Sequence, residues 1–384
     1  MELPAPGADA LAHSARLQAL IRDEIHAAGG SLPFSRYMAL ALYAPGLGYY
    51  MAGSRKLGAD GDFVTAPELS PLFGQALAQQ AAEVLAMPGC DAVLEIGAGS
   101  GALAAALLEE LERLGRLPAQ YLILELSPDL RARSRDTLAA RVPHLIGRVA
   151  WLNQLPPRFS GFIIGNEVLD AMPCALVFAR DGEILETHVR ATAAGGFETV
   201  DCAPEPAVLA AAAALALPPQ GYRSELQLEA QAFLRTLGGV LERGVALFLD
   251  YGFPQREYYH PQRNEGTLMC HYRHRAHADP FLHVGLQDIT THVDFTAMAT
   301  AARAGGLQLA GYASQAQFLI NCGITDVLAR TDAADVRAYA PLAAGVQKLL
   351  APSEMGELFK AVAFTRGWDA PLAGFAQGDR SRTL

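Results

Sequence analysis

The chain has 384 residues, 51% of them hydrophobic, which is enough for one large α/β domain with insertions or for two domains around a substantial core. A net charge of −10 and the lack of a basic run argue against nonspecific binding to nucleic acid or to a membrane surface. The longest apolar stretch, residues 207–217, is too short to cross a bilayer, and the first residues lack the features of a secretory signal, which predicts a cytoplasmic protein. Five scattered cysteines without a CxxC pair are expected to be reduced and mostly buried.

Residues 10–28 have apolar side chains at helical spacing, and Gly29-Gly30 predicts the end of this helix. The following segment, residues 31–74, contains many aromatic residues interspersed with glycine and proline, without a single period. This composition predicts a shaped loop surface rather than part of the core.

The end of this segment has two interpretations. Ser70 followed by Pro71 predicts a helix N-cap with proline at the first helical position. Asp62 and Glu68 instead suit a loop that folds over a ligand, and both interpretations stay open at this point.

The most informative segment is residues 94–101 (LEIGAGSG), an apolar strand that runs into a glycine turn. Gly97 and Gly99 allow a tight turn and a close approach to a ligand, and a helix is predicted directly behind them. The next apolar run, residues 121–124, ends in Glu125, where a doubly wound fold places the acid that hydrogen-bonds a ribose. The segment therefore predicts a nucleotide-like cofactor.

Two classes of cofactor fit this turn. Gly97-x-Gly99-x-x-Ala102 also satisfies the loose dinucleotide fingerprint, and a purely structural turn remains an alternative. Glu95 favours S-adenosylmethionine, because a carboxylate beside the turn opposes a pyrophosphate. S-adenosylmethionine has no phosphate and carries a sulfonium and an ammonium group.

Apolar strand candidates recur at residues 92–96, 121–124, 161–164 and 245–249, with helices between the first three. This alternation predicts a parallel sheet in a Rossmann-like α/β fold. The long gap before the fourth strand contains an alanine-rich helix pair at about residues 205–238, and we expect it to be an insertion over the carboxyl edge of the sheet.

Several polar side chains follow the third and fourth strands. Asn166, Glu167 and Asp170 come after residues 162–164, and the two carboxylates could hold one guanidinium if the turn is helical. An Asx turn with a helix cap is the structural alternative. Asp250 ends the fourth strand, where a plain turn and a substrate contact are both open.

A group of metal-ligand residue types lies further on, but it lacks an HExxH or CxxC frame, so no metal site is predicted. The group consists of Cys270, His271, His274, His277 and His283.

Five blocks along the chain together resemble the MidA family over about residues 30–330. They are GDFVTAPELSPLFG, LEIGAGSG, GFIIGNEVLDAMP, LFLDYG and GTLMCHYRHRAHADPFLHVGLQDITTHVDF. The resemblance to a bacterial member implies a class I methyltransferase fold. We expect an N-terminal helical and loop extension at residues 1–88 and a methyltransferase domain at residues 89–384. Within that domain we expect an insertion at about residues 175–240 and a loop region at about residues 253–295.

The resemblance also implies site residues. The residues expected to bind S-adenosylmethionine are Thr65, Glu95, Gly97, Gly99, Gly101, Glu125 and Asn166. Those expected at the methyl-transfer centre are Glu68, Asn166, Glu167 and Asp170. Family members often have glutamine where this chain has Ser134, a departure that we expect to be peripheral.

The mitochondrial members of the family are complex I assembly factors that symmetrically dimethylate an arginine on a core subunit. The resemblance thus implies a protein-arginine methyltransferase whose partner is a protein, with a subunit of the respiratory NADH dehydrogenase as the expected target. A small-molecule methyltransferase and a noncatalytic assembly chaperone that keeps the cofactor site remain alternatives, because fold alone does not choose between them.

Overall fold

A computed structural model of the chain describes residues 3–53 and 65–384. The chain divides into two compact units, each built from three segments. One unit, here the strand unit, comprises Met1–Phe63, Leu169–Ala232 and Phe253–Asp294. The other, here the turn unit because it contains the glycine turn, comprises Val64–Val168, Phe233–Gly252 and Phe295–Leu384.

The turn unit alternates strands and helices over its first half and ends in an antiparallel pair of strands. Its elements are α3 Ala66–Leu69, α4 Pro71–Leu85, β2 Ala92–Ile96, α5 Ala102–Arg113, β3 Gln120–Leu124, α6 Pro128–Arg141, η1 Pro143–Arg148, β4 Val149–Leu152, β5 Phe159–Asn166, β10 Leu241–Phe253, α10 Phe295–Ala304, β15 Gln308–Ser314, α11 Gln315–Asn321, α12 Ile324–Leu328, α13 Val336–Leu350, β16 Phe359–Arg366, η2 Ala373–Phe375 and η3 Ser381–Thr383. The helix α8, Leu228–Val240, leads into β10 from the strand unit.

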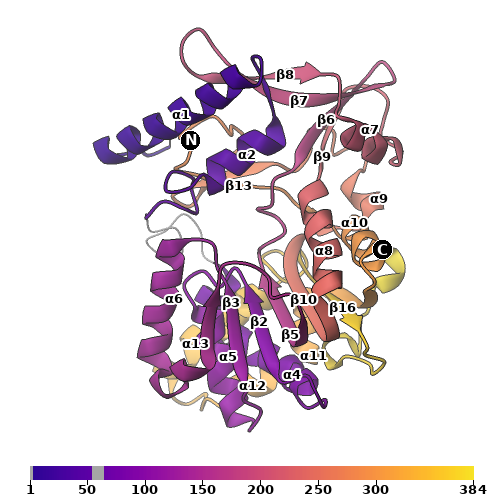
Figure 1. Cartoon of the computed structure of the whole chain (residues 1–384). Coiled ribbons are helices and arrows are strands. Elements are labelled where there is room, and N and C mark those ends of the chain that lie inside the picture. Colours follow the sequence, from indigo (N-terminus) through magenta and orange to yellow (C-terminus); the bar gives the residue numbers. More distant parts are fainter. Residues whose placement is uncertain (1–2, 54–64) are drawn as a thin grey trace. The chain divides into compact units, whose positions relative to one another are not determined.

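The sheet of the turn unit has the strand order β15-β16-β10-β5-β2-β3-β4 (Figure 1). The strands from β10 to β4 are parallel, whereas β16 runs antiparallel to both β10 and β15. From β2 the chain proceeds outward through β3 to β4, and then returns to the other side of β2 with β5 and β10. The strand order thus reverses at the carboxyl ends of β2 and β5, and open α/β sheets bind ligands at such a point.

The four strands predicted from apolar runs are confirmed as β2, β3, β5 and β10. The Rossmann-like parallel arrangement predicted from them is confirmed as well. Ser70 is the N-cap of α4, and its hydroxyl accepts a hydrogen bond of 3.3 Å from the Leu72 N–H, as the Ser70-Pro71 pair predicted. The N-terminal helix is confirmed as α1, Ala8–Ala27.

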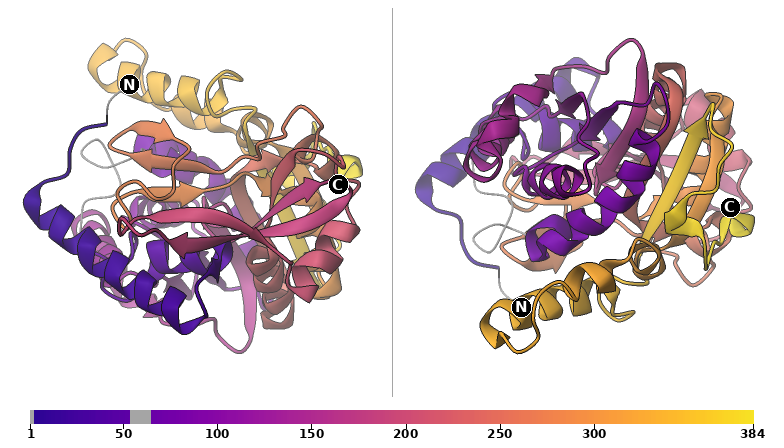
Figure 2. Two further views of the ribbon diagram at one scale, coloured as in Figure 1. Left: turned by 90° about the horizontal axis from the view of Figure 1, so that it is seen from above. Right: turned by 90° about the horizontal axis from the view of Figure 1, so that it is seen from below.

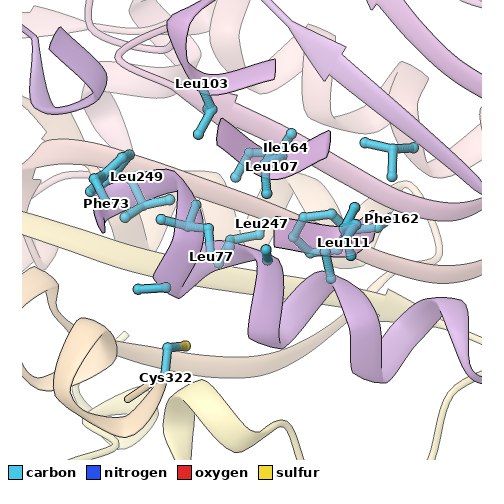
Figure 3. Packing of buried hydrophobic residues seen from close by; sticks show 14 of the residues in the cluster. Phe73, Leu77, Leu103, Leu107, Leu111, Phe162, Ile164, Leu247, Leu249 and Cys322 are labelled. Atoms are coloured by element: carbon cyan, nitrogen blue, oxygen red, sulfur yellow. The ribbon is translucent and has the colours of Figure 1, made fainter. Parts of the chain in front are cut away.

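The core of the turn unit lies between the sheet and the helices α4 and α5. Phe162 and Ile164 of β5 and Leu247 of β10 point toward Leu77 and Leu107 of these helices (Figure 3). Each of these side chains is fully buried. Burial at about 25 cal/mol per Å² of apolar surface makes this layer the main stabilising contact of the unit.

The strand unit contains two antiparallel sheets and short helices. Its elements are α1, β1 Leu32–Pro33, α2 Phe34–Tyr43, β6 Ala175–Arg180, β7 Glu183–Ala191, β8 Phe197–Cys202, α7 Pro206–Ala213, β9 Tyr222–Leu226, α9 Gln255–Tyr258, β11 Met269–Tyr272, β12 Arg275–His277, β13 Asp288–Thr290 and β14 Val293–Asp294. One sheet has the order β1-β7-β6-β9 with β8 paired to β7, and the other has the order β12-β11-β13. The helix α1 packs beside β7 (Figure 2, left).

The prediction of a loop surface at residues 31–74 is wrong for its first part. Phe34, Tyr37 and Met38 lie on α2, are fully buried and belong to the core of the strand unit. Their spacing of three and four residues is helical, but the surrounding glycine and proline residues obscured it. Residues 54–64 lie outside the described part of the chain.

The predicted alanine-rich helix pair at about residues 205–238 is also wrong in part. The strand β9 lies between α7 and α8 and pairs with β6 along five residues. The alternation of Tyr222, Ser224 and Leu226 is too short for its period to stand out beside the alanine run. The five cysteines are free thiols, and four of them are buried, as expected. Over residues 3–53 and 65–384, no helix is both long and apolar enough to span a membrane.

Truncation of the core beneath the sheet should be costly. We expect Leu107→Ala to lower the free energy of unfolding by about 2–5 kcal/mol, because it removes buried methyl groups and leaves a cavity. Ile320→Ala is the matched control, since Ile320 on α11 is 47% exposed and should change stability by less than about 0.5 kcal/mol. Chemical denaturation of both variants measures the difference, and equal losses would contradict this placement of the core.

Candidate cofactor site

The glycine turn connects β2 to α5 at the point where the strand order reverses. Gly97, Gly99 and Gly101 have φ angles of 69°, 55° and 83°, a region that favours glycine. The Gly97 N–H donates a 2.9 Å hydrogen bond to the Leu124 carbonyl, which fixes the turn to the end of β3. The turn therefore lies between the carboxyl ends of β3 and β5.

Two of these glycines are also required by close neighbours. A Cβ atom on Gly97 would lie 3.1 Å from Val168 Cγ2, and one on Gly101 would lie 2.9 Å from the Ser134 Cα. The expectation that Ser134 is peripheral is wrong, because Ser134 is fully buried against the turn. Its hydroxyl accepts a hydrogen bond from Trp151 Nε1 at 2.9 Å.

Glu125 follows β3 and ties the turn to this strand. Its carboxylate accepts hydrogen bonds from the Gly99 N–H at 3.1 Å and from the Ser127 N–H at 2.9 Å. Burial raises the pKa of Glu125, although these N–H donors act in the opposite direction. Each carboxylate oxygen keeps a second acceptor position for a donor such as a ribose hydroxyl.

Glu95 is buried within the sheet beneath the turn. It is in register with Ile123 and Ile164, which belong to the core, and its carboxylate accepts a 2.7 Å hydrogen bond from the Tyr121 hydroxyl. Burial raises the pKa of Glu95 to about 7, and the negative charge of Glu125 adds to the rise, while the Tyr121 hydrogen bond opposes it.

Asn166 is the last residue of β5 and Glu167 follows it, beside the glycine turn. The Asn166 amide donates a 3.0 Å hydrogen bond from Nδ2 to Glu167 Oε1. Its Oδ1 is buried and has no hydrogen-bond partner among the residues that the structure describes. Glu167 has a φ of 53°, an uncommon conformation for a residue with a side chain, and such strain occurs most often at functional sites.

Asp250 supports this turn from the neighbouring strand. Its Oδ2 accepts a 3.1 Å hydrogen bond from the Val168 N–H, and the Glu167 N–H donates at 2.8 Å to the Leu249 carbonyl. Of the two interpretations of Asp250, the structural one thus has direct support. The end of β10 holds the residues after β5 in place.

Glu68 and Thr65 come from the segment that precedes α4. Glu68 lies on α3, and its Oε1 accepts a hydrogen bond from the Ser100 hydroxyl in the glycine turn. Thr65 is the N-cap of α3, and its carbonyl accepts from the Glu68 and Leu69 N–H groups. Asp62, the other acid proposed for this segment, lies outside the described residues.

Asp170 belongs to the strand unit, whereas Glu167 belongs to the turn unit. The hypothesis of a helical turn that carries both is wrong, because residues 167–171 form bends and a turn. Asp170 is buried, and its carbonyl accepts a 3.0 Å hydrogen bond from the Thr291 N–H. The left-handed conformation of Glu167 is incompatible with a helix that starts there.

The histidines and the cysteine around residues 270–283 lie on or after the hairpin β11–β12. Burial is the first cause that lowers the pKa of His283, and the nearby His277 and Arg273 add to it. Within the described ranges, no group of three or more His, Cys, Asp or Glu side chains could hold a metal ion.

The residues at the carboxyl edge fit S-adenosylmethionine. The glycines of the turn allow a close approach of the ligand, Asn166 Oδ1 is a buried acceptor without a donor among the described residues, and the nearby acids suit hydroxyl and ammonium groups. A dinucleotide would bring a pyrophosphate to a turn flanked by carboxylates, which is unfavourable.

Comparisons with known proteins agree with this chemistry. A family model for S-adenosyl-L-methionine-dependent methyltransferases matches residues 76–313. The chain belongs to this family. A Burkholderia thailandensis protein whose crystal structure contains S-adenosyl-homocysteine is 52% identical, with a TM-score of 0.97 over 100% of both chains.

More distant relatives have a more specific description. Over 90% of this chain and 86% of the relative, it is 27% identical to the mitochondrial protein arginine methyltransferase NDUFAF7 homolog of Drosophila melanogaster. Over 87% of this chain and 83% of the relative, it is 26% identical to NDUFAF7 of Danio rerio. The fold is therefore the class I methyltransferase fold, and S-adenosylmethionine is the cofactor.

Two contacts at the site were not predicted from the sequence. The sequence pattern places Tyr121 only in an apolar strand run, although its hydroxyl donates to Glu95, and it places Ser100 only in the turn, although its hydroxyl donates to Glu68. The first pairing had a signal, because Tyr121 and Glu95 come from neighbouring parallel strands and lie two residues apart in register. The second had none, because it joins segments 32 residues apart.

The buried Glu95 predicts a pH dependence of stability in the absence of cofactor. Its pKa is raised from 4.5 to about 7 by folding, so its contribution is fully present below pH 4.5 and is lost as the pH rises through 7. We expect Glu95→Gln to be more stable than the parent by about 3 kcal/mol at pH 8 and to show a smaller loss between pH 5 and pH 8.

Chemical denaturation at both pH values measures this effect. Glu112→Gln is the control, because Glu112 is a half-exposed residue at the end of α5 that pairs with His144. A parent protein whose stability does not fall between pH 5 and pH 8 would contradict the protonation of Glu95 in the folded state.

Loss of the Glu125 carboxylate should weaken binding of the cofactor. We expect Glu125→Ala to reduce the affinity for S-adenosyl-homocysteine by about 1–3 kcal/mol, the usual effect of losing a hydrogen bond to a charged group. Calorimetry measures the affinity. Binding as tight as that of the parent would exclude Glu125 from recognition of the ribose.

Proposed function

We propose that this protein transfers the methyl group of S-adenosylmethionine to an arginine side chain of a protein substrate. The similarity to relatives described as protein arginine methyltransferases, which extends over 90% of this chain in the first of them, carries this proposal. The proposed target is a subunit of respiratory complex I, and the proposed product is symmetric dimethylarginine.

The chemistry of the carboxyl edge supports a cationic acceptor. A guanidinium is a planar fork of N–H donors, and a carboxylate is the acceptor that matches it. Glu167 presents such a carboxylate, which accepts from the amide of Asn166, while the N–H groups of Glu167 and Val168 donate to acceptors on β10. The strained conformation of Glu167 is consistent with a role that requires this fixed orientation.

The bound cofactor supplies an electrophilic methyl group on its sulfonium sulfur. In the proposed reaction Glu167 orients the guanidinium so that one nitrogen lies in line with this methyl group, and alignment is the main source of acceleration. The Glu167 carboxylate then accepts the proton that the nitrogen loses. Asn166 keeps the carboxylate in position throughout.

Asp170 is a second proposed catalytic acid, assigned from its place in the block after β5. Its burial in the strand unit and the bond to Thr291 support a structural role as well. Asp170→Asn distinguishes the two roles: a catalytic acid loses activity at an unchanged melting temperature, whereas a structural one loses activity only in proportion to the folded fraction.

The assay combines purified protein, labelled S-adenosylmethionine and purified complex I subunits. We expect label on the protein fraction, and acid hydrolysis should release symmetric dimethylarginine. Label on a small molecule would indicate the small-molecule alternative, and cofactor binding without turnover on any subunit would indicate a noncatalytic chaperone.

Glu167→Gln tests the acceptor site. We expect the affinity for S-adenosyl-homocysteine to stay within about threefold and methyl transfer to fall at least about tenfold, which corresponds to about 1.4 kcal/mol. The amide keeps the size of the side chain but removes the charge that orients a guanidinium. Unchanged transfer in a folded variant would exclude Glu167 from the reaction.

A further inference from the structure

Glu68 contacts the glycine turn from α3, a helix that is held in place by its neighbours. The helix α3 that carries it packs against α4 and α5, and Ala66 on the same helix is fully buried. The neighbouring Ser70 is buried as the N-cap of α4. The backbone of Glu68 is therefore fixed on both sides, and its position relative to the turn is determined by the core of the turn unit.

The Glu68 carboxylate has one oxygen engaged and one available. Oε1 accepts from the Ser100 hydroxyl, and Glu68 is partly exposed. Within residues 3–53 and 65–384, Glu68 forms no ion pair, and Oε2 has no hydrogen-bond partner. A carboxylate held in this way, with an open oxygen beside a ligand-binding turn, suits a cationic group of the ligand.

The two acids beside the turn, Glu125 and Glu68, differ in the part of the cofactor that they can bind. Both oxygens of Glu125 already accept from backbone N–H groups, and this residue follows β3, on the side where the ribose is expected. Glu68 contacts the turn at Ser100, two residues before α5. The adenosine and methionine parts of S-adenosylmethionine lie at opposite ends of the molecule, and the methionine part carries the primary ammonium.

We propose that Glu68 binds the methionine ammonium of S-adenosylmethionine, and that the Ser100 hydroxyl orients its carboxylate for this contact. Glu68 is thereby a cofactor-binding residue rather than one that holds the methyl acceptor. The proposal rests on the cofactor of the family and is independent of whether the acceptor is an arginine. A charge-assisted hydrogen bond of this kind is stronger than one between neutral groups.

The test compares two ligands that differ in the methionine part. S-adenosyl-homocysteine has the ammonium, whereas 5′-methylthioadenosine lacks the whole amino-acid group. We expect Glu68→Gln to lower the affinity for S-adenosyl-homocysteine at least tenfold and to leave the affinity for 5′-methylthioadenosine within about twofold of the parent value. Calorimetry on the full chain measures both affinities. Ser100→Ala should lower the affinity for S-adenosyl-homocysteine alone, and by a smaller factor than Glu68→Gln.

Two controls accompany this variant. Glu125→Ala should lower the affinity for both ligands by the same factor, because both contain the ribose. Glu112→Gln should leave both affinities unchanged. An equal loss of both ligands in Glu68→Gln would overturn the proposal and show that Glu68 acts only by supporting the turn. Unchanged binding of both would also overturn it.

A further measurement uses the parent protein and avoids any effect of substitution on folding. The analogue of S-adenosyl-homocysteine that lacks only the amino group should bind at least tenfold more weakly than S-adenosyl-homocysteine. Equal affinities of the two ligands would overturn the proposal. Because no methyl acceptor is present, these results are independent of the arginine assay, and either proposal can fail without the other.

Discussion

The cofactor site depends on the hydrogen bonds that hold the glycine turn between β3 and β5. The Glu125 carboxylate accepts from the Gly99 N–H, and the Gly97 N–H donates to the Leu124 carbonyl. A turn built largely of glycine has high conformational entropy in the unfolded chain, so these contacts are needed to fix one conformation. Every proposed contact with the cofactor depends on that conformation.

Three acidic residues surround the turn, and they differ in how deeply they are buried. Glu95 is fully enclosed, with its pKa raised to about 7, whereas Glu125 is stabilised by backbone donors and Glu68 is partly exposed. The carboxylates of Glu68 and Glu125 beside the turn would repel a phosphate but attract a ligand with a sulfonium and an ammonium. The same residues that exclude a dinucleotide thus favour S-adenosylmethionine.

In the proposed reaction, the residues after β5 hold the methyl acceptor. Asp250 and Leu249 at the end of β10 hold the backbone of Glu167 and Val168, and Val168 in turn lies against Gly97. The glycine turn and the residues proposed to hold the acceptor are thus connected through one set of contacts at the carboxyl edge of the sheet. This connection explains why an acid at residue 167 can have a left-handed conformation, since neighbouring strands supply the stabilisation.

The sequence by itself determined the four parallel strands, the glycine turn, the acid after β3 and the cap at Ser70, because each is a local pattern of apolar spacing or backbone preference. It did not determine the burial of Ser134 against Gly101, the bond between Ser100 and Glu68, or the assignment of Glu167 and Asp170 to different units. These depend on which distant segments pack together. The free energy of such packing comes from contacts between residues far apart in the chain, which leave no period or motif in the sequence.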